Sequence, residues 1–163
     1  MKKCLSFLPV IDNNSKVLIL GSMPGIKSLE AQQYYAYSRN RFWKLMGVFC
    51  NCSNMHNLSY DEKIKIVLEN NFAIWDVLGF CERDGSLDSS IENEVPNDIS
   101  KLLEKYNNIE KIVLNGNKAY AVFKKYFPEL LENYSCYKMP STSPANAKYR
   151  LEDLYVKWSK GLN

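Results

Sequence analysis

A short apolar run that stops at a glycine-rich loop constrains the fold of this chain most strongly. Residues 17–20 are Val, Leu, Ile and Leu, and the loop Gly21-Ser22-Met23-Pro24-Gly25 follows at once. A brief apolar run bounded by turn residues predicts a buried strand that ends in a tight loop. In open α/β sheets ligands bind outside the carboxyl ends of the strands, so this loop is the first candidate for a binding site.

Strands and helices alternate along the rest of the chain. We predict strands at residues 16–20, 71–78, 111–114 and 135–139, and helices at residues 42–49, 60–69, 98–106 and 119–126. A helical turn is expected near residues 28–33, a polar, turn-rich stretch at residues 79–97, and a last helix after Ser143. This order predicts one domain over residues 1–163, an α/β protein built as a three-layer α/β/α sandwich around a four-stranded parallel sheet.

The composition is that of an ordinary globular protein. Hydrophobic residues make up 46% of the chain and charged residues 24%. No apolar run approaches the roughly 18 residues that a membrane span requires, and the apolar stretch near the N-terminus is too short for an export signal. We therefore expect a cytoplasmic protein without a membrane partner.

The cysteine pattern argues against a metal centre. The chain has five cysteines, an odd number that predicts reduced thiols in the absence of an export signal. Cys50 and Cys52 form the only close pair, and His56 is the only histidine. We therefore expect no metal and no cofactor, and no motif supports a Ser-His-Asp or Cys-His mechanism.

Charge is unevenly distributed, although the net charge is only +3. Residues 1–59 contain seven Lys/Arg and two Asp/Glu, residues 60–100 contain three and ten, and residues 101–163 contain eleven and six. An anionic partner on the two basic ends would avoid the acidic middle, provided that the fold brings the ends together. A mixed solvated surface without a partner explains the same pattern.

Three further segments have candidate functional groups. Ser141-Thr142-Ser143-Pro144 offers hydroxyls and, if Ser143 caps a helix that starts at Pro144, free N–H groups for a phosphate. Residues 32–43 combine aromatic side chains, amides and two arginines, which stack on bases and contact phosphates in nucleic-acid sites. Alternatively, Asn40 caps a helix and these aromatic side chains are core. Asp76, at the end of a strand, is a candidate acid, base or base-edge reader, or else an N-cap.

These motifs together resemble the uracil-DNA glycosylase superfamily, and within it the hypoxanthine-DNA glycosylase (DNA-deoxyinosine glycosylase) branch. The resemblance covers residues 17–147 and rests on the glycine-rich loop, on Ser141-Thr142-Ser143-Pro144, and on Tyr35-Ala36 followed by Asn40 and Phe42-Trp43. It implies hydrolysis of the N-glycosidic bond of a deaminated base in DNA, hypoxanthine first and then uracil or xanthine, leaving an abasic site. The target nucleotide is flipped out, because the stacked duplex shields its glycosidic bond.

The resemblance also implies residue roles. Mismatch-specific relatives position the attacking water with an asparagine where this chain has Met23, which cannot do so, so Asn40 is expected to orient the water. The residues expected to shape the base pocket are Gly21, Ser22, Met23, Pro24 and Gly25. Tyr35 is expected to stack on the flipped base, and Asp76 and Asn115 to read its edge. The residues expected to contact DNA phosphate are Ser141, Thr142, Ser143 and Asn146.

Three other functions remain open. A mismatch-specific uracil-DNA glycosylase is disfavoured by Met23, and a small-molecule transferase lacks a full Gly-x-Gly-x-x-Gly or Walker pattern. A nucleic-acid-binding module that has lost catalysis would share the same fold. In the leading hypothesis the partner is DNA with a deaminated base, bound by a monomer.

Overall fold

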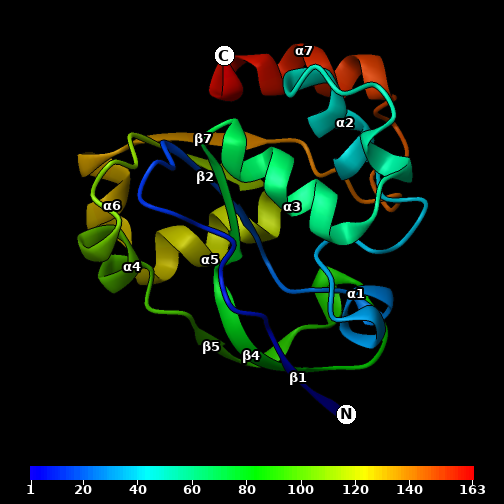
Figure 1. Cartoon of the computed structure of the whole chain (residues 1–163). Helices are drawn as coiled ribbons and strands as arrows, with labels where there is room; N and C mark the ends of the chain where they lie inside the picture. The colour runs from blue at the N-terminus through cyan, green and yellow to red at the C-terminus, as the bar shows by residue number, and fades with distance from the viewer.

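A parallel sheet forms the centre of the computed structural model, which describes residues 1–163 (Figure 1). Its strands are β2 (Val17–Gly21), β3 (Phe72–Asp76), β6 (Lys111–Asn115) and β7 (Ser135–Met139). They lie in the order β3-β2-β6-β7, and every neighbouring pair is parallel. The predicted α/β fold with a four-stranded parallel sheet is therefore confirmed.

Helices cover both faces of this sheet. One face packs against α2 (Phe42–Phe49), α3 (Tyr60–Glu69) and α7 (Leu151–Leu162), and the other against α4 (Ile99–Lys105), α5 (Asn117–Tyr126) and α6 (Pro128–Asn133) (Figure 1). Because side chains alternate along a strand, each strand contributes to both layers. In β2, Ile19 joins the first core and Leu18 and Leu20 join the second.

Three strands form a second, antiparallel sheet that the sequence did not predict. They are β1 (Lys2–Leu5), β4 (Leu78–Arg83) and β5 (Glu92–Pro96), in the order β1-β4-β5. The expected polar, turn-rich stretch over residues 79–97 is thus wrong, as it contains β5, most of β4 and the short helix η2 (Asp88–Ser90). Antiparallel strands with one solvated face lack a continuous apolar run, so the sequence gives no strong strand signal for this sheet.

The strand predicted over residues 71–78 is also wrong in its extent. β3 ends at Asp76, opposite Gly21 of β2, and β4 begins two residues later in the other sheet. The N–H of Val77 between them donates to the carbonyl of Gly21 at 2.8 Å. One apolar run therefore supplies strands to two sheets.

The other predicted helices are confirmed with small shifts. The helical turn near residues 28–33 is α1 (Ile26–Ala31), and α5 begins two residues before its predicted start. Asp98 caps α4, because its side chain accepts a hydrogen bond from Lys101 N at 3.1 Å. Helix α3 carries a capping box, and a short helix, η1 (Met55–Asn57), precedes it.

The last helix begins later than predicted. Helix α7 starts at Leu151, whereas Ser143 and Pro144 lie in an isolated turn. Asn146 N donates to the Ser143 carbonyl at 3.0 Å, and Ser143 Oγ accepts from Ala145 N at 3.2 Å. Ser-Pro chemistry that opens helices also makes turns, and the turn is what forms here.

Candidate active site

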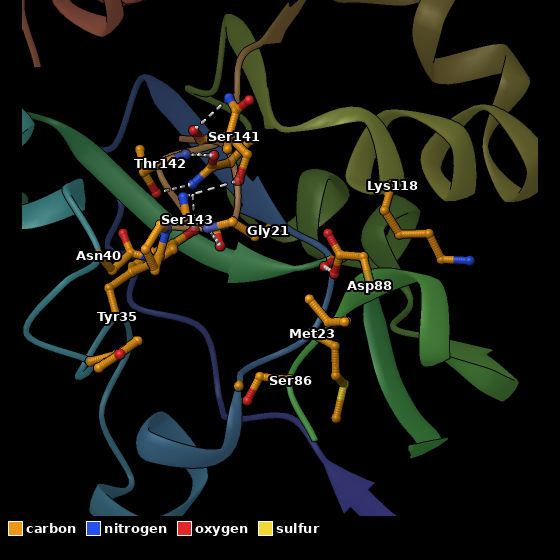
Figure 2. Close-up of a pocket in the computed structure, with 18 of the residues that line it drawn as sticks. Gly21, Met23, Tyr35, Asn40, Ser86, Asp88, Lys118, Ser141, Thr142 and Ser143 are labelled. Carbon is orange, nitrogen blue, oxygen red and sulfur yellow. Dashed lines mark hydrogen bonds between the residues drawn. The ribbon is translucent and has the colours of Figure 1, made fainter. Parts of the chain in front are cut away.

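A cleft with a volume of about 1190 Å³ opens at the carboxyl ends of the parallel strands. The loops that follow β2, β4, β6 and β7 line it together with the end of β3, so residues far apart in the sequence meet there (Figure 2). All of the predicted site residues line this cleft: Gly21, Ser22, Met23, Pro24, Gly25, Tyr35, Asn40, Asp76, Asn115, Ser141, Thr142, Ser143 and Asn146.

The glycine-rich loop at the end of β2 forms one wall. A Cβ atom on Gly21 would lie 2.6 Å from Asp76 Oδ1 and 3.0 Å from the Tyr35 hydroxyl oxygen, so a larger residue does not fit. Met23 is buried in the core, with 7% of its surface exposed. A thioether is only a weak hydrogen-bond acceptor, so this loop shapes the cleft without a side chain that could hold water at Met23.

Asp76 forms the floor of the cleft. Its side chain is buried, and Oδ2 accepts a hydrogen bond from Ser6 Oγ at 3.0 Å. Burial raises the pKa of the Asp76 carboxyl to about 7, while the Ser6 hydroxyl and the charge of Arg83 act in the opposite direction. Near neutral pH this group therefore exists in both forms, so it can donate or accept a hydrogen bond.

Tyr35 presents only one face of its ring to the cleft. Its backbone has a left-handed φ of 53°, and its ring stacks on Phe42 with centroids 3.8 Å apart. Asn115 Nδ2 donates to the Tyr35 hydroxyl at 3.2 Å, which fixes the plane of the ring. With Phe42 on one side, the opposite face is the one left for a base.

Asn115 and Thr142 bond to each other, which gives both residues a positioning role. Thr142 is fully buried, and its backbone N–H donates to Asn115 Oδ1 at 3.0 Å. Asn115 Nδ2 donates to Thr142 Oγ1 at 3.1 Å as well as to Tyr35. The Asn115 side-chain amide and the Thr142 backbone N–H already bond within the protein, and the roles expected for them, base reading by Asn115 and phosphate contact by Thr142, stay predictions.

Ser141 and Ser143 are better placed to meet a phosphate. Ser141 Oγ accepts from Ser143 N at 3.1 Å and Ser143 Oγ accepts from Ala145 N, so each hydroxyl hydrogen points elsewhere. Gly116, with a φ of 102°, lets Ser141 approach closely, since a Cβ there would lie 3.1 Å from Ser141 Cβ. Asn146 Nδ2 donates to the Ser141 carbonyl at 3.1 Å and braces the turn.

Asn40 lies two residues before the first residue of α2, and its amide is held in place. Its Oδ1 accepts a hydrogen bond from Phe42 N at 2.9 Å, so the side chain also satisfies the first N–H of the helix. The capping alternative is therefore correct in part, because Asn40 bonds to the first helical N–H although Arg41 lies between it and the helix. The bond fixes the amide plane and leaves Nδ2 and one lone pair of Oδ1 for another group.

Arg41 holds the loop after β7 in place by hydrogen bonds to its backbone carbonyls. Its guanidinium donates to the carbonyls of Thr142, Ser143, Asn146 and Tyr149, with distances of 2.7 Å to Ser143 and 3.1 Å to Asn146. A guanidinium that bonds carbonyl groups in this way is not free for DNA. Of the two arginines expected to meet phosphate, only Arg39 is exposed.

Four further cleft residues were missed in the sequence: Ser86, Asp88, Lys118 and Lys148. Figure 2 shows Asp88 and Lys118 across the cleft from Tyr35 and Asn40. Ser22 Oγ donates to Asp88 Oδ1 at 2.6 Å, and Ile26 N donates to Ser86 Oγ at 2.8 Å. Only the antiparallel sheet brings Ser86 and Asp88 back to the glycine-rich loop, so no local pattern could reveal them.

Two other properties bear on the type of site. No helix combines the length and the apolar character needed to cross a membrane. No group of three or more His, Cys, Asp or Glu side chains is arranged so that it could hold a metal ion.

Comparisons with known proteins agree with this arrangement. A family model described as the uracil DNA glycosylase superfamily matches residues 8–160. A Methanosarcina acetivorans protein named hypoxanthine DNA glycosylase is 38% identical over 144 residues, which cover 88% of each chain. A Methanosarcina barkeri protein of the same name is 35% identical over 119 residues, covering 73% of this chain and 74% of the relative.

A solved structure supports the fold over its whole length. It is a solution NMR structure of a Methanosarcina acetivorans protein that is provisionally named a uracil DNA glycosylase. It superimposes with a TM-score of 0.84 at 34% sequence identity, covering 99% of this chain and 97% of that one.

Proposed function

The chain belongs to the uracil DNA glycosylase superfamily, and from that premise we propose that it is a DNA-deoxyinosine glycosylase. Its reaction is hydrolysis of the N-glycosidic bond of hypoxanthine in DNA, with uracil and xanthine as further substrates. The product is an abasic site. The two similar proteins named hypoxanthine DNA glycosylase support this choice of base.

The observation that carries the proposal is the fixed amide of Asn40 in the cleft. Phe42 N holds Asn40 Oδ1 at 2.9 Å, so the rest of the amide is oriented before any ligand arrives. The second lone pair of Oδ1 can accept from a water molecule and place it for attack on C1′. Asn40 and the Ser141–Ser143 turn are neighbours, since Arg41 N donates to the Thr142 carbonyl at 3.1 Å.

The chemistry then depends on the departing base. An amide is a poor base, so it cannot strongly activate water, and breaking of the C1′–N bond runs ahead of attack. The electron pair of that bond leaves with the base, and water supplies the hydroxyl to C1′ and the proton to the base. Asp76 in its protonated form is a hydrogen-bond donor on the cleft floor, where it can stabilise charge that develops on the base.

The side of the cleft formed by the loop after β7 is suited to binding the DNA backbone. The hydroxyl hydrogens of Ser141 and Ser143 supply neutral donors, which protein–DNA contacts often direct at phosphate oxygens. Lys148 adds a cation at the cleft rim. Tyr35 offers its open face for stacking on the flipped base.

A mismatch-specific uracil glycosylase fits less well. Such an enzyme would need a water-positioning side chain in the glycine-rich loop, and that position is the buried Met23. A binding module that has lost catalysis is the other alternative, and an activity assay separates it from a glycosylase.

The decisive experiment is cleavage of labelled duplexes that each contain one hypoxanthine, uracil or xanthine, followed by alkali to break abasic sites. We expect wild type to cut the hypoxanthine duplex and Asn40→Ala to cut it about 100-fold or more slowly, with DNA binding retained. Asn107→Ala, in an exposed turn outside the cleft, serves as the matched control and should cut like wild type.

Two outcomes would contradict the proposal. If folded wild type cuts none of these duplexes, as double or single strands, the protein is a binding module. If Asn40→Ala cuts as fast as Asn107→Ala, another group positions the water.

A further inference from the structure

The loop between β4 and β5 forms a wall of the cleft that the proposed mechanism does not use. This hairpin tip (residues 84–90) carries Ser86 and Asp88 to the glycine-rich loop. Figure 2 shows Asp88 with its carboxylate beside the cleft, on the side away from Tyr35 and Asn40. Both residues are exposed, so their polar groups are accessible to a ligand.

The hairpin tip is fixed to the glycine-rich loop by hydrogen bonds. The Arg83 guanidinium, buried at the base of the tip, donates to the Pro24 carbonyl. Ser86 Oγ accepts from Ile26 N at 2.8 Å, and Asp88 Oδ1 accepts from Ser22 Oγ at 2.6 Å. Asp88 is therefore preorganised at the cleft.

The Asp88 carboxylate has capacity for more hydrogen bonds than it makes. A carboxylate has about four acceptor positions, and Ser22 is the one donor that bonds to this one. It forms no ion pair, and the cleft lysine Lys118 is instead 3.4 Å from Glu94. The open positions favour a ligand that brings an N–H or O–H donor.

The charges around the cleft indicate which part of a nucleotide lies beside Asp88. Asp88 and Asp76 are close enough for their charges to interact, and Lys118 on the same side of the cleft is paired with Glu94, so the two carboxyl groups disfavour a phosphate beside them. The hydroxyls of Ser141 and Ser143 and the cation of Lys148 are on the other walls. A flipped nucleotide would thus place its phosphate at that side and its base toward the two acids.

We propose that Asp88 determines base specificity by accepting the N1–H of the flipped hypoxanthine. This inference rests on the proposed function. Once N9 is bonded to the sugar, N1–H is the single N–H donor of hypoxanthine, while O6, N3 and N7 are acceptors. A carboxylate can therefore engage the polar edge of hypoxanthine only at N1.

The contact has a kinetic signature. The N1–H bond to Asp88 exists before the glycosidic bond breaks, and a nearby anion does not help an electron-rich base to leave. The bond should therefore act in binding more than in the chemical step. Removing it should raise the enzyme concentration for half-maximal single-turnover rate and leave the maximal rate nearly unchanged.

The test compares deoxyinosine with 1-methyldeoxyinosine, which lacks the N1–H, in otherwise identical duplexes. Single-turnover rates are measured over a range of enzyme concentrations for wild type, Asp88→Ala and Asp88→Asn, with Asp84→Ala as the matched control on the same hairpin tip. We expect wild type to favour deoxyinosine, and Asp88→Ala to lower that preference about 10- to 100-fold, as for a hydrogen bond to a charged group. Asp88→Asn keeps an acceptor for Ser22 and should fall between the two.

The outcomes separate the two proposals. If wild type does not cut deoxyinosine, the proposed function fails. If wild type and Asp84→Ala cut it, but Asp88→Ala slows both substrates equally, Asp88 only braces the loop and the specificity role is wrong. The same holds if Asp88→Ala is unfolded and Asp88→Asn keeps the full wild-type preference.

Discussion

At the scale of single residues, two carboxyl groups on the cleft differ in their surroundings. Asp76 is buried on the floor and bonded to Ser6, whereas Asp88 is exposed at the rim and bonded to Ser22. Environment, and not residue type, thus allows one acid to donate and the other to accept, a division common among catalytic carboxyl pairs.

Replacing Asp76 by Asn should change how stability depends on pH. Burial raises the pKa of Asp76 to about 7 from 3.8, so between these values the folded state holds a proton that the unfolded chain has released. Wild type therefore loses stability as pH rises through this window, and Asp76→Asn does not. The stability of Asp76→Asn relative to wild type should increase by about 2–4 kcal/mol from about pH 4 to about pH 8, measured by urea unfolding.

The exposed Asp84 provides the comparison for this experiment. Asp84→Asn should follow wild type at both pH values. A constant difference between Asp76→Asn and wild type would mean that folding does not raise the pKa of Asp76.

The sequence predicted which residues line the cleft where a motif sets their position, but not the hydrogen bonds that these residues make with each other. Asn40 and Tyr35 line the cleft as predicted, because each lies next to a recognisable helix start or loop. The bond between Asn115, at the end of β6, and Thr142, 27 positions later, was not predicted. Such pairing depends on the assembled sheet and leaves no local pattern.

At the scale of elements, the loop after β7 is an irregular segment held by one side chain. Four carbonyls between Thr142 and Tyr149 turn toward the Arg41 guanidinium, which stands just before α2. The sequence predicted a helix there from Ser143-Pro144, since the partner 101–108 positions away is invisible to local rules.

Arg41→Lys should loosen this loop while the sheets stay intact. A lysine ammonium has three donors in a compact head and cannot span carbonyls that a planar guanidinium reaches together. We expect a loss of about 1–3 kcal/mol in the free energy of unfolding, and faster amide hydrogen exchange at residues 141–149.

Arg39→Lys is the matched substitution two positions away, on an exposed side chain. It should leave both measurements unchanged. Equal stability of the two variants would show that the carbonyls find other donors when Arg41 is shortened.

At the scale of the whole molecule, the fold rearranges the charge pattern of the chain. The basic ends do meet, because Arg41 and residues 142–149 are in contact. The acidic middle of the chain also contributes to this site, since Asp76 and the hairpin tip line the same cleft. A cleft with one acidic and one polar, partly basic side orients a nucleotide, which a uniform basic surface would not.

DNA binding should weaken with salt, and Lys148 should account for part of that dependence. Each phosphate contact made by a cation releases a counterion, which adds about −0.9 to the slope of log K against log salt. Lys148→Ala should reduce the magnitude of this slope by about 1, measured by fluorescence anisotropy on a hypoxanthine duplex.

Lys101→Ala on α4 is the control, because Lys101 is exposed and lies outside the cleft. Its slope should match that of wild type. Identical slopes for Lys148→Ala and wild type would exclude Lys148 from the DNA contact.

The hydrogen bonds from the Arg41 guanidinium to the loop after β7 have a consequence for protein synthesis. A chain is synthesised from its N-terminus, so the glycine-rich loop and Arg41 are made before Tyr149, the last of the residues whose carbonyls bond to Arg41. Until then the guanidinium lacks the carbonyl groups to which it donates, and the wall of the cleft formed by the loop after β7 is not yet in place. A nascent chain that does not yet include residues 142–149 therefore lacks the carbonyl partners of Arg41.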